Sequence, residues 1–309
     1  MNVFELAQAV AAVENKQATN QSILIYGPPK IGKTRLAATL AKVPEVTSVT
    51  YFGAENGHAT IVDMVRTGVL TEEEAKKIII INMVDTPEQA VAWDTVVKCL
   101  VVQKAFNICE VHGRVECPHC KAQEVATKTK LSWQAFDLKK LRSTDWVILD
   151  SGSQIADSAM NYIQKGVSYD IKAGYEEYGF QGRVMTDILT VVQSAQYCNY
   201  CVITHELLMD ARDDDKKMLS EVKLKDMFSK LYPLVGSKPF SMKVGKYFGH
   251  VIYMERKINK PSGGSAFMYK PDVVTGSRSG MRLEDETEMD FRYVFEKMGW
   301  TAWKRPATK

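Results

Sequence analysis

The sequence predicts an α/β fold with a mainly parallel central sheet. Short apolar runs, which are typical of buried parallel strands, alternate along most of the chain with stretches of helical periodicity. The chain has 309 residues, of which 45% are hydrophobic and 25% are charged. These values are ordinary for a globular protein, and the length suffices for one large α/β domain with an insertion.

The expected elements can be placed in chain order from the spacing of apolar residues. They are an amphipathic helix over 3–15, a strand over 22–26, a helix over 34–42, strands over 48–53 and 78–82 separated by a helix at about 58–67, helices over 86–102 and 131–141, a strand over 145–150, helices at about 153–165 and 181–196, and a strand over 200–206. The four consecutive isoleucines of 78–82 predict a strand that is covered on both faces.

The last third of the chain has a different pattern. Runs over 248–257 and 266–271 flank a Gly-Gly turn and predict a β-hairpin added to the sheet edge. We therefore expect one domain over 1–285, with an insertion at about 107–124, and a tail over 286–309. The N-terminal segment contains acids, no apolar run is long enough to span a bilayer, and the six cysteines lack a disulfide context, so a reducing cytoplasm is expected.

A phosphate-binding loop lies between the first strand and the following helix. The stretch GPPKIGKT matches G-x-x-x-x-G-K-[ST], whose backbone amides and helix N-terminus bind phosphate. Lys33 is expected to reach the β- and γ-phosphates of ATP, and Thr34 to bind Mg²⁺. Lys30 either contacts phosphate or, as we favour, faces solvent. The nucleotide-contacting candidates are Gly27, Pro28, Pro29, Lys30, Ile31, Gly32, Lys33, Thr34, Arg35 and Asp150.

Three polar residues follow predicted strands at the edge where ligands collect in parallel sheets. Asp150 ends the run DWVILD and is the candidate second Mg²⁺ ligand, although many strands end in a turn aspartate. Glu55 can orient the attacking water, or it is an exposed loop acid. His205 can sense the γ-phosphate, or it is a hydrogen-bonded histidine at a strand end.

The order of these motifs resembles the RecA-like P-loop ATPases. GPPKIGKT, FGAENG, DWVILDS and VITHE follow one another as the corresponding motifs do in that family, over roughly residues 20–285. The THE triplet, the later YPLVG over 232–236 and TGSRSG over 275–280 resemble phage-encoded, shortened RecA ATPases of the Sak type, which act in single-strand annealing. The chain departs from the RecA pattern in having His205 where glutamine is usual and in carrying the insertion.

The resemblance implies a Mg²⁺-dependent ATPase that binds single-stranded DNA and works as a ring or filament in the host cytoplasm. It implies that a cation from a neighbouring subunit completes the site; of Arg278, Arg282 and Lys257 in the C-terminal region, we choose Arg278. It also implies that a single-strand binding or replication protein is a partner. Segments 166–183 and 207–235 would face DNA. In the first, aromatic residues either stack on unpaired bases or pack beneath the loop. The second has a mixed run of acids and lysines, which is more typical of a solvated surface.

The insertion contains two pairs of potential metal ligands, each with a two-residue gap. Cys109, His112, Cys117 and Cys120 fit a closed, structural Zn²⁺ site, with His119 as an alternative to His112. Reduced thiols and a disulfide are the competing interpretations. Two other functions are compatible with the phosphate-binding loop: a nucleotide-gated loader or adaptor for a replication partner, and a small-molecule kinase.

Overall fold

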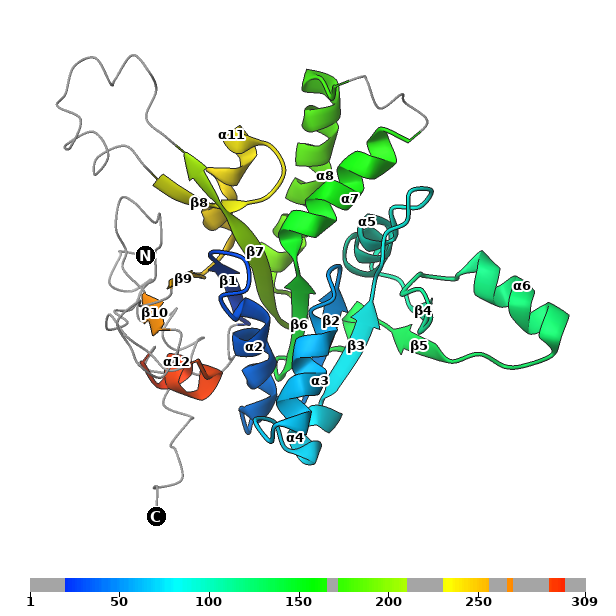
Figure 1. The fold of residues 1–309 in the computed structure, drawn as a ribbon, viewed down its shortest axis with the longest axis horizontal. Coiled ribbons are helices and arrows are strands. Elements are labelled where there is room, and N and C mark those ends of the chain that lie inside the picture. The colour runs from blue at the N-terminus through cyan, green and yellow to red at the C-terminus, as the bar shows by residue number, and fades with distance from the viewer. Residues whose placement is uncertain (1–19, 166–171, 210–229, 256–265, 269–288, 298–309) are drawn as a thin grey trace, which may run out of the picture.

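The computed structural model describes residues 20–165, 172–209, 230–255, 266–268 and 289–297. A single sheet runs through the centre of the molecule, and a small two-stranded sheet projects to one side (Figure 1). The predicted N-terminal helix over 3–15 lies outside the described residues. Among the helices that the structure describes, none is long and apolar enough to cross a membrane.

The central sheet is mainly parallel, as predicted. Its eight strands run in the order β10-β9-β1-β7-β6-β2-β3, with β8 paired to β7. Among the described strands of this sheet, only the β9–β10 and β7–β8 pairs are antiparallel. The strands are β1 (Ser22–Tyr26), β2 (Ser48–Gly53), β3 (Ile78–Asn82), β6 (Asp145–Asp150), β7 (Asn199–Met209), β8 (Lys230–Leu234), β9 (His250–Glu255) and β10 (Ala266–Met268).

Helices cover both faces of this sheet and create two apolar cores. One core joins the sheet to α5 (Val91–Val96), α7 (Gly152–Ile163) and α8 (Tyr175–Ser194). The other joins it to α2 (Lys33–Ala38), α3 (His58–Arg66) and α12 (Phe291–Lys297). The alternating orientation of side chains in β1 assigns Leu24 to the first core and Ile25 to the second, which explains its continuous apolar sequence.

The isoleucine strand β3 is not covered on both faces, contrary to the prediction. It is the last strand of the sheet beside β2, and Ile80 is 36% exposed. Its apolar composition does not distinguish an edge strand from a central one. Between α3 and β3 lies the short helix α4 (Glu72–Lys76), whose N-terminus has a capping box formed by Thr71 and Glu74.

Two predicted helices have different structures. The helix expected over 131–141 is instead β5 (Trp133–Phe136) and a 3₁₀ turn, because β5 pairs with β4 (Phe106–Cys109) in the small sheet. The helix expected over 86–102 begins only at Val91, because a tight Thr86–Gln89 turn precedes it. It continues as a π-helix over Val97–Val102. A further helix, α6 (Pro118–Thr127), completes the insertion, which Figure 1 shows extending away from the sheet.

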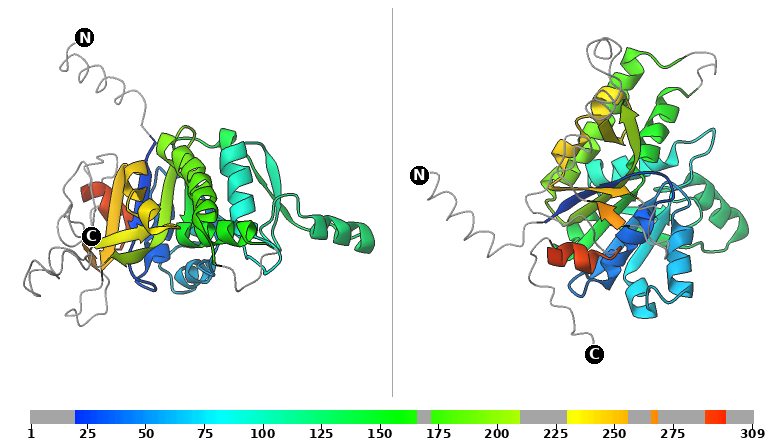
Figure 2. Two further views of the ribbon diagram at one scale, coloured as in Figure 1. Left: turned by 90° about the horizontal axis from the view of Figure 1, so that it is seen from above. Right: turned by 60° about the vertical axis from the view of Figure 1, so that its left-hand side comes forward.

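Helix α8 begins at Tyr175, six residues before the predicted start, so part of the segment expected to be a DNA-binding loop is helical. Figure 2 shows α7 and α8 lying alongside one another on one face of the sheet. Most of the second predicted loop, over 210–229, lies outside the described residues. Within the described residues, β10 pairs with β9 at the sheet edge, while residues 256–265 between them are not described.

Candidate functional site: a nucleotide site at the carboxyl edge of the sheet

The phosphate-binding loop leads from the buried strand β1 into α2. Gly27 has φ +152°, and a Cβ there would collide with the backbone oxygen of Met254 on β9. Gly32 has φ +103°, a conformation that glycine adopts without steric cost, and immediately precedes the helix. Both glycines therefore permit a compact loop whose amides and helix terminus can bind phosphate.

Lys33 is buried and folded back across this loop. Its Nζ donates to the carbonyl oxygens of Gly27, at 2.8 Å, and Pro28, at 2.7 Å. Burial lowers the pKa of Lys33 to about 8, although the charges of Asp150, Glu55 and Glu206 oppose this shift. The ammonium group is thus held by neutral carbonyls at a position where a phosphate can replace them. Of the other loop residues, Ile31 is buried, whereas Pro29, Lys30 and Arg35 are exposed.

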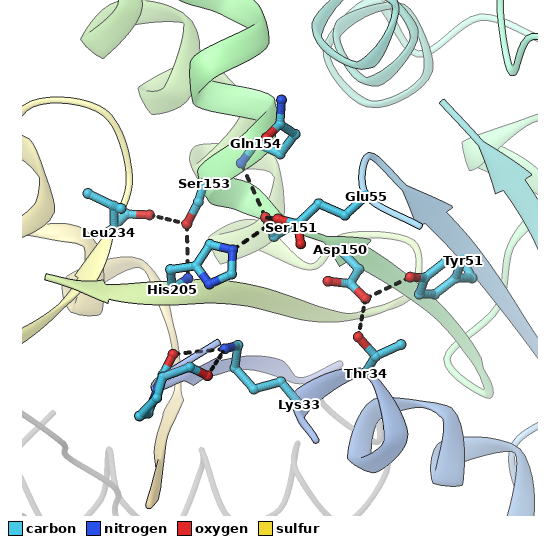
Figure 3. Close-up of polar contacts among 12 residues, drawn as sticks. Lys33, Thr34, Tyr51, Glu55, Asp150, Ser151, Ser153, Gln154, His205 and Leu234 are labelled. Atoms are coloured by element: carbon cyan, nitrogen blue, oxygen red, sulfur yellow. Dashed lines mark hydrogen bonds and ion pairs between the residues drawn. The ribbon is translucent and has the colours of Figure 1, made fainter. Parts of the chain in front are cut away.

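Thr34 and Asp150 meet although β1 and β6 are separated in the sheet by β7. The Thr34 hydroxyl donates to Oδ2 of Asp150 at 2.6 Å, and the phenol of Tyr51 donates to the same oxygen at 2.6 Å (Figure 3). Burial raises the pKa of Asp150, while these two hydrogen bonds oppose the shift. A Cβ on Gly57 would collide with Tyr51 and lie 2.7 Å from Asp150, so glycine keeps the space beside the carboxylate open.

The donor set fits Mg²⁺, which prefers hard oxygen ligands. Asp150 is 3% exposed, and among the described residues no cationic side chain forms an ion pair with it. A buried carboxylate without a cationic partner is costly, and a divalent ion at this position would compensate its charge. Thr34 and Asp150 are therefore the residues that can hold the ion.

Glu55 lies just beyond β2, at the same edge of the sheet. Its Oε1 accepts a hydrogen bond from Ser151 and lies 3.1 Å from Nε2 of His205 (Figure 3). The contact with His205 lowers the pKa of Glu55; burial opposes this effect and Ser151 adds to it. The side chain remains 38% exposed, so an ionised carboxylate faces solvent close to the phosphate-binding loop.

His205, on β7, is positioned by neighbours on α7 and β8. Its backbone amide donates to Oγ of Ser153 on α7 at 2.9 Å, and Ser153 in turn donates to the carbonyl of Leu234 on β8. Ser151 caps α7 through the amide of Gln154 and also contacts Glu55. Strand β7, helix α7 and strand β8 thus converge on the candidate base.

Sequence reasoning missed Tyr51 and Ser153. The only available signal for Tyr51 was its residue type, a tyrosine inside an apolar strand. Its side chain lies on the same face of β2 as Val49, two residues before Gly53 at the end of the strand. Ser153 had no distinguishing signal, since small hydroxyl residues are common in first helical turns. Arg278, the predicted in-trans cation, lies outside the described residues.

The cysteine and histidine residues of the insertion converge on one point. One ligand atom from each of Cys109, His112, Cys117 and Cys120 lies within 4.8 Å of the others. His112 Nδ1 is 3.2 Å from the sulfur of Cys120, 3.7 Å from Cys117 and 3.8 Å from Cys109. The three cysteines are buried and unpaired by disulfides. Burial, with the nearby thiols, raises the pKa of Cys120 to about 12, because thiolates at this spacing repel one another without a cation.

The local backbone explains this convergence. Cys109 ends β4, a tight turn carries His112, and Cys117 immediately precedes α6, whose first turn holds Cys120. His119, the alternative ligand, instead packs edge-on against the ring of His112 at 5.4 Å between centroids. Leu131 and Trp133 cover the cluster from the β5 side.

The aromatic residues of the predicted DNA-facing segment do not pack beneath a loop where they are described. Tyr175 is 99% exposed, Tyr178 44% and Phe180 42%, all in the first turns of α8. Lys172 and Arg183 are exposed beside them in the sequence. Tyr169 lies outside the described residues.

Fold and site together define an ATP hydrolase with a phosphate-binding loop. The sequence profile of a family described as "AAA domain" matches residues 19–270, which is most of the chain, and the chain belongs to this family. No curated protein sequence matches the chain.

Several solved structures align with the chain at low similarity. An ATPase of the type III secretion system of pathogenic bacteria has a TM-score of 0.38 and 10% identity, over 76% of this chain and 51% of that one. The RadB recombinase has a TM-score of 0.34 and 16% identity, over 80% of each chain. The ATP synthase subunit NeqB from Nanoarcheaum equitans has a TM-score of 0.39 and 9% identity, over 84% of this chain and 51% of that one. The chain thus spans about half the length of two of these proteins.

Proposed function

We propose that this chain is a RecA-type, Mg²⁺-dependent ATPase that binds single-stranded DNA during phage recombination or replication, in the cytoplasm of a host cell. The hydrolytic part of this proposal depends on one observation: Glu55 lies at the edge of the sheet where Thr34 meets Asp150. This places a candidate general base, a phosphate-binding loop and an acidic Mg²⁺ ligand around one space.

Each residue has a distinct role in the proposed mechanism. Lys33 exchanges its two carbonyl partners for phosphate oxygens, and the loop amides bind the remaining charge. Thr34 and Asp150 hold Mg²⁺, which, when bound, neutralises charge on the transferred phosphoryl group. Glu55 accepts a proton from the attacking water as the γ-phosphate bond breaks.

Ser151 and His205 regulate the candidate base in this scheme. Both contact Oε1 of Glu55, so the carboxylate must give up or share these contacts before it can accept a proton from water. His205, at the end of β7, can change partners when a γ-phosphate arrives, which is the sensing role proposed for it. Arg278 remains the proposed cation supplied by a neighbouring subunit in a ring or filament.

The DNA-binding part of the proposal is supported by the exposed aromatics of α8. Tyr175, Tyr178 and Phe180 present rings to solvent near Lys172 and Arg183, the combination that stacks on unpaired bases and attracts phosphate. A single-strand binding or replication protein is the further partner proposed for this activity.

We also propose that the insertion binds one structural Zn²⁺ ion. Three thiols and an imidazole form a closed ligand set of the type that zinc prefers, and the site offers no open position for catalysis. The buried position of the cysteines argues for a role in holding α6 against the β4–β5 hairpin.

The DNA-binding proposal is tested by measuring ATP hydrolysis with and without single-stranded DNA, with Lys33→Ala as the nucleotide-binding control. We expect DNA to stimulate hydrolysis by the wild type and Lys33→Ala to be inactive in both conditions. If the wild type hydrolyses ATP at the same rate with and without DNA, the ATPase activity stands and single-stranded DNA is rejected as its partner. A loader, adaptor or small-molecule kinase would then be the better description.

A further inference from the structure

A small pocket lies on the face of the sheet covered by α5 and α7. One of its lining residues, Arg114, closely follows the metal-ligand cluster residue His112; this cluster comprises Cys109, His112, Cys117 and Cys120. The pocket has a volume of about 130 Å³, below the 300–1,000 Å³ typical of pockets for drug-sized ligands and suited to a single flat ring. Its walls come from the Thr86–Gln89 turn, the start of α5, the end of α7 and the residue after the metal-ligand turn. None of these residues belongs to the nucleotide site.

Two of the residues that line the pocket form a stacked pair of aromatic rings. Trp93 and Tyr162 lie 4.0 Å apart between centroids with 30° between their planes. The amide of Trp93 donates to Ser158 of α7 at 3.0 Å, which fixes the indole relative to the tyrosine. Tyr162 is 48% exposed, so the part of the residue that Trp93 does not cover can contact a further ring. The indole Nε1 is buried and has no hydrogen-bond partner among the described residues.

Two cations lie at the rim. Arg114 donates to the side chain of Gln89 at 2.7 Å, which places its guanidinium beside the turn. Lys165 follows α7 and is exposed. Two acids also line the pocket, but Asp94 is paired with Lys98 at 2.7 Å, which leaves Glu88 as the acid without a described ion pair. The aromatic pair can stack on a nucleobase, while Arg114, Lys165 and the side-chain amide of Gln89 can contact the phosphate backbone to which that base is attached.

Backbone hydrogen bonds to Cys109, one of the proposed metal ligands, hold the main chain of Arg114. The amide of Cys109 donates to the carbonyl of Arg114 at 3.0 Å, and the amide of Gly113 donates to the carbonyl of Cys109 at 2.9 Å. Gly113 has φ +62°, and its carbonyl accepts a buried hydrogen bond from Thr95 of α5 at 2.9 Å. Arg114 is therefore held between a metal ligand and the helix that carries Trp93.

We propose that this pocket binds one unpaired nucleobase of single-stranded DNA by stacking on Tyr162, with Arg114 and Lys165 contacting the adjacent backbone. This inference rests on the proposed DNA-binding function and adds a second contact region to the aromatics of α8. It also gives the insertion a function in that binding, because the metal-ligand turn carries Arg114 to the rim.

The test compares two labelled oligonucleotides of equal length, an oligo-dT and an abasic strand, by fluorescence anisotropy. Tyr162→Ala is expected to weaken dT binding by about fivefold or more and to leave abasic binding unchanged, because only the dT strand loses a stacked ring. Tyr162→Phe keeps the ring and should bind as the wild type does. Arg114→Ala should weaken binding to both strands, because it removes a backbone contact.

The outcomes separate the two proposals. If the wild type binds dT and Tyr162→Ala has the same ratio of dT to abasic affinity as the wild type, the proposed base-binding role of the pocket is wrong. The proposed DNA-binding function would then still stand. A wild type that binds neither strand would reject both, and the pocket would then be a candidate for a peptide side chain. DNA-independent ATP hydrolysis by Tyr162→Ala, measured in parallel, verifies that the variant is folded.

Discussion

Tyr51 and Thr34 donate hydrogen bonds to the same oxygen of Asp150, each at 2.6 Å. Strand β2 supplies the phenol, and the β2–β6 register brings Tyr51 beside the strand that ends in Asp150. The carboxylate is therefore held in one orientation from two sides. If Thr34 turns to an arriving Mg²⁺ ion, Tyr51 remains as the donor that fixes Asp150.

The first prediction concerns this phenol. Tyr51→Phe removes one hydrogen bond, worth about 1 kcal/mol, from the oriented carboxylate. We expect the Mg²⁺ concentration for half-maximal hydrolysis to rise about fivefold, with a smaller change in the KM for ATP. Tyr200→Phe is the matched control, because Tyr200 of β7 is also a buried tyrosine of the sheet but lies in the other apolar core and is in register with Val147 of β6. An unaltered Mg²⁺ requirement in Tyr51→Phe would reject the positioning role.

The lowered pKa of Lys33 predicts that ATP affinity depends on pH. Burial lowers this pKa to about 8 in the free protein, and a bound phosphate would raise it again. Between pH 8 and the higher pKa of the complex, binding must take up a proton, so affinity should fall as pH rises. Calorimetry at about pH 9 in two buffers of different ionisation enthalpy should report uptake of up to one proton. Binding without proton uptake would show that Lys33 is already protonated in the free site.

His205 should control the acid limb of the rate profile. Its contact with Glu55 is the main cause of the lowered carboxyl pKa, and a base works only while it is ionised. In the wild type, kcat/KM should stay constant until the pH falls below the usual pKa range of glutamate. In His205→Ala the pKa returns toward its ordinary value, so the fall in rate should begin at higher pH. Coincident profiles for the two proteins would exclude this role.

The metal-ligand cluster gives a prediction about composition and stability. We expect about one zinc per chain by elemental analysis, and below about 0.3 in Cys117→Ser. Loss of the ion removes the link between β4 and α6, so the melting temperature should fall. Cys201→Ser is a comparison outside the cluster, at a buried cysteine of β7, and should retain zinc. Wild-type protein with less than about 0.3 zinc per chain would contradict the proposal.

Short sequence patterns predicted those elements whose structure depends on residues close together in the chain. The glycine-rich loop, the strand run before it and the acid at the end of β6 each have a short-range signal. The position of β3 had none, since four isoleucines occupy an edge strand that sequence periodicity cannot distinguish from a central one. Likewise β5 was mistaken for a helix because its pairing with β4 is a long-range contact across the insertion.

The same distinction applies to the site. Glu55, Asp150 and Thr34 could be chosen from motif order, but their mutual distances depend on the sheet order, which places β7 between β1 and β6. Tyr51 and Ser153 became visible only through that register, because their residue types are unremarkable in a strand and a helix start. Trp93 and Tyr162 are 69 residues apart and meet only because α5 packs on α7.

Single-turnover hydrolysis by Glu55→Gln, with ATP affinity measured on the same protein, tests whether Glu55 is the base for ATP hydrolysis. We expect a rate lowered by about 10²–10⁴-fold and an affinity within a few-fold of the wild type, because the amide keeps the shape of the side chain but cannot accept the proton. A rate close to that of the wild type, with normal ATP binding, would exclude Glu55 as the base.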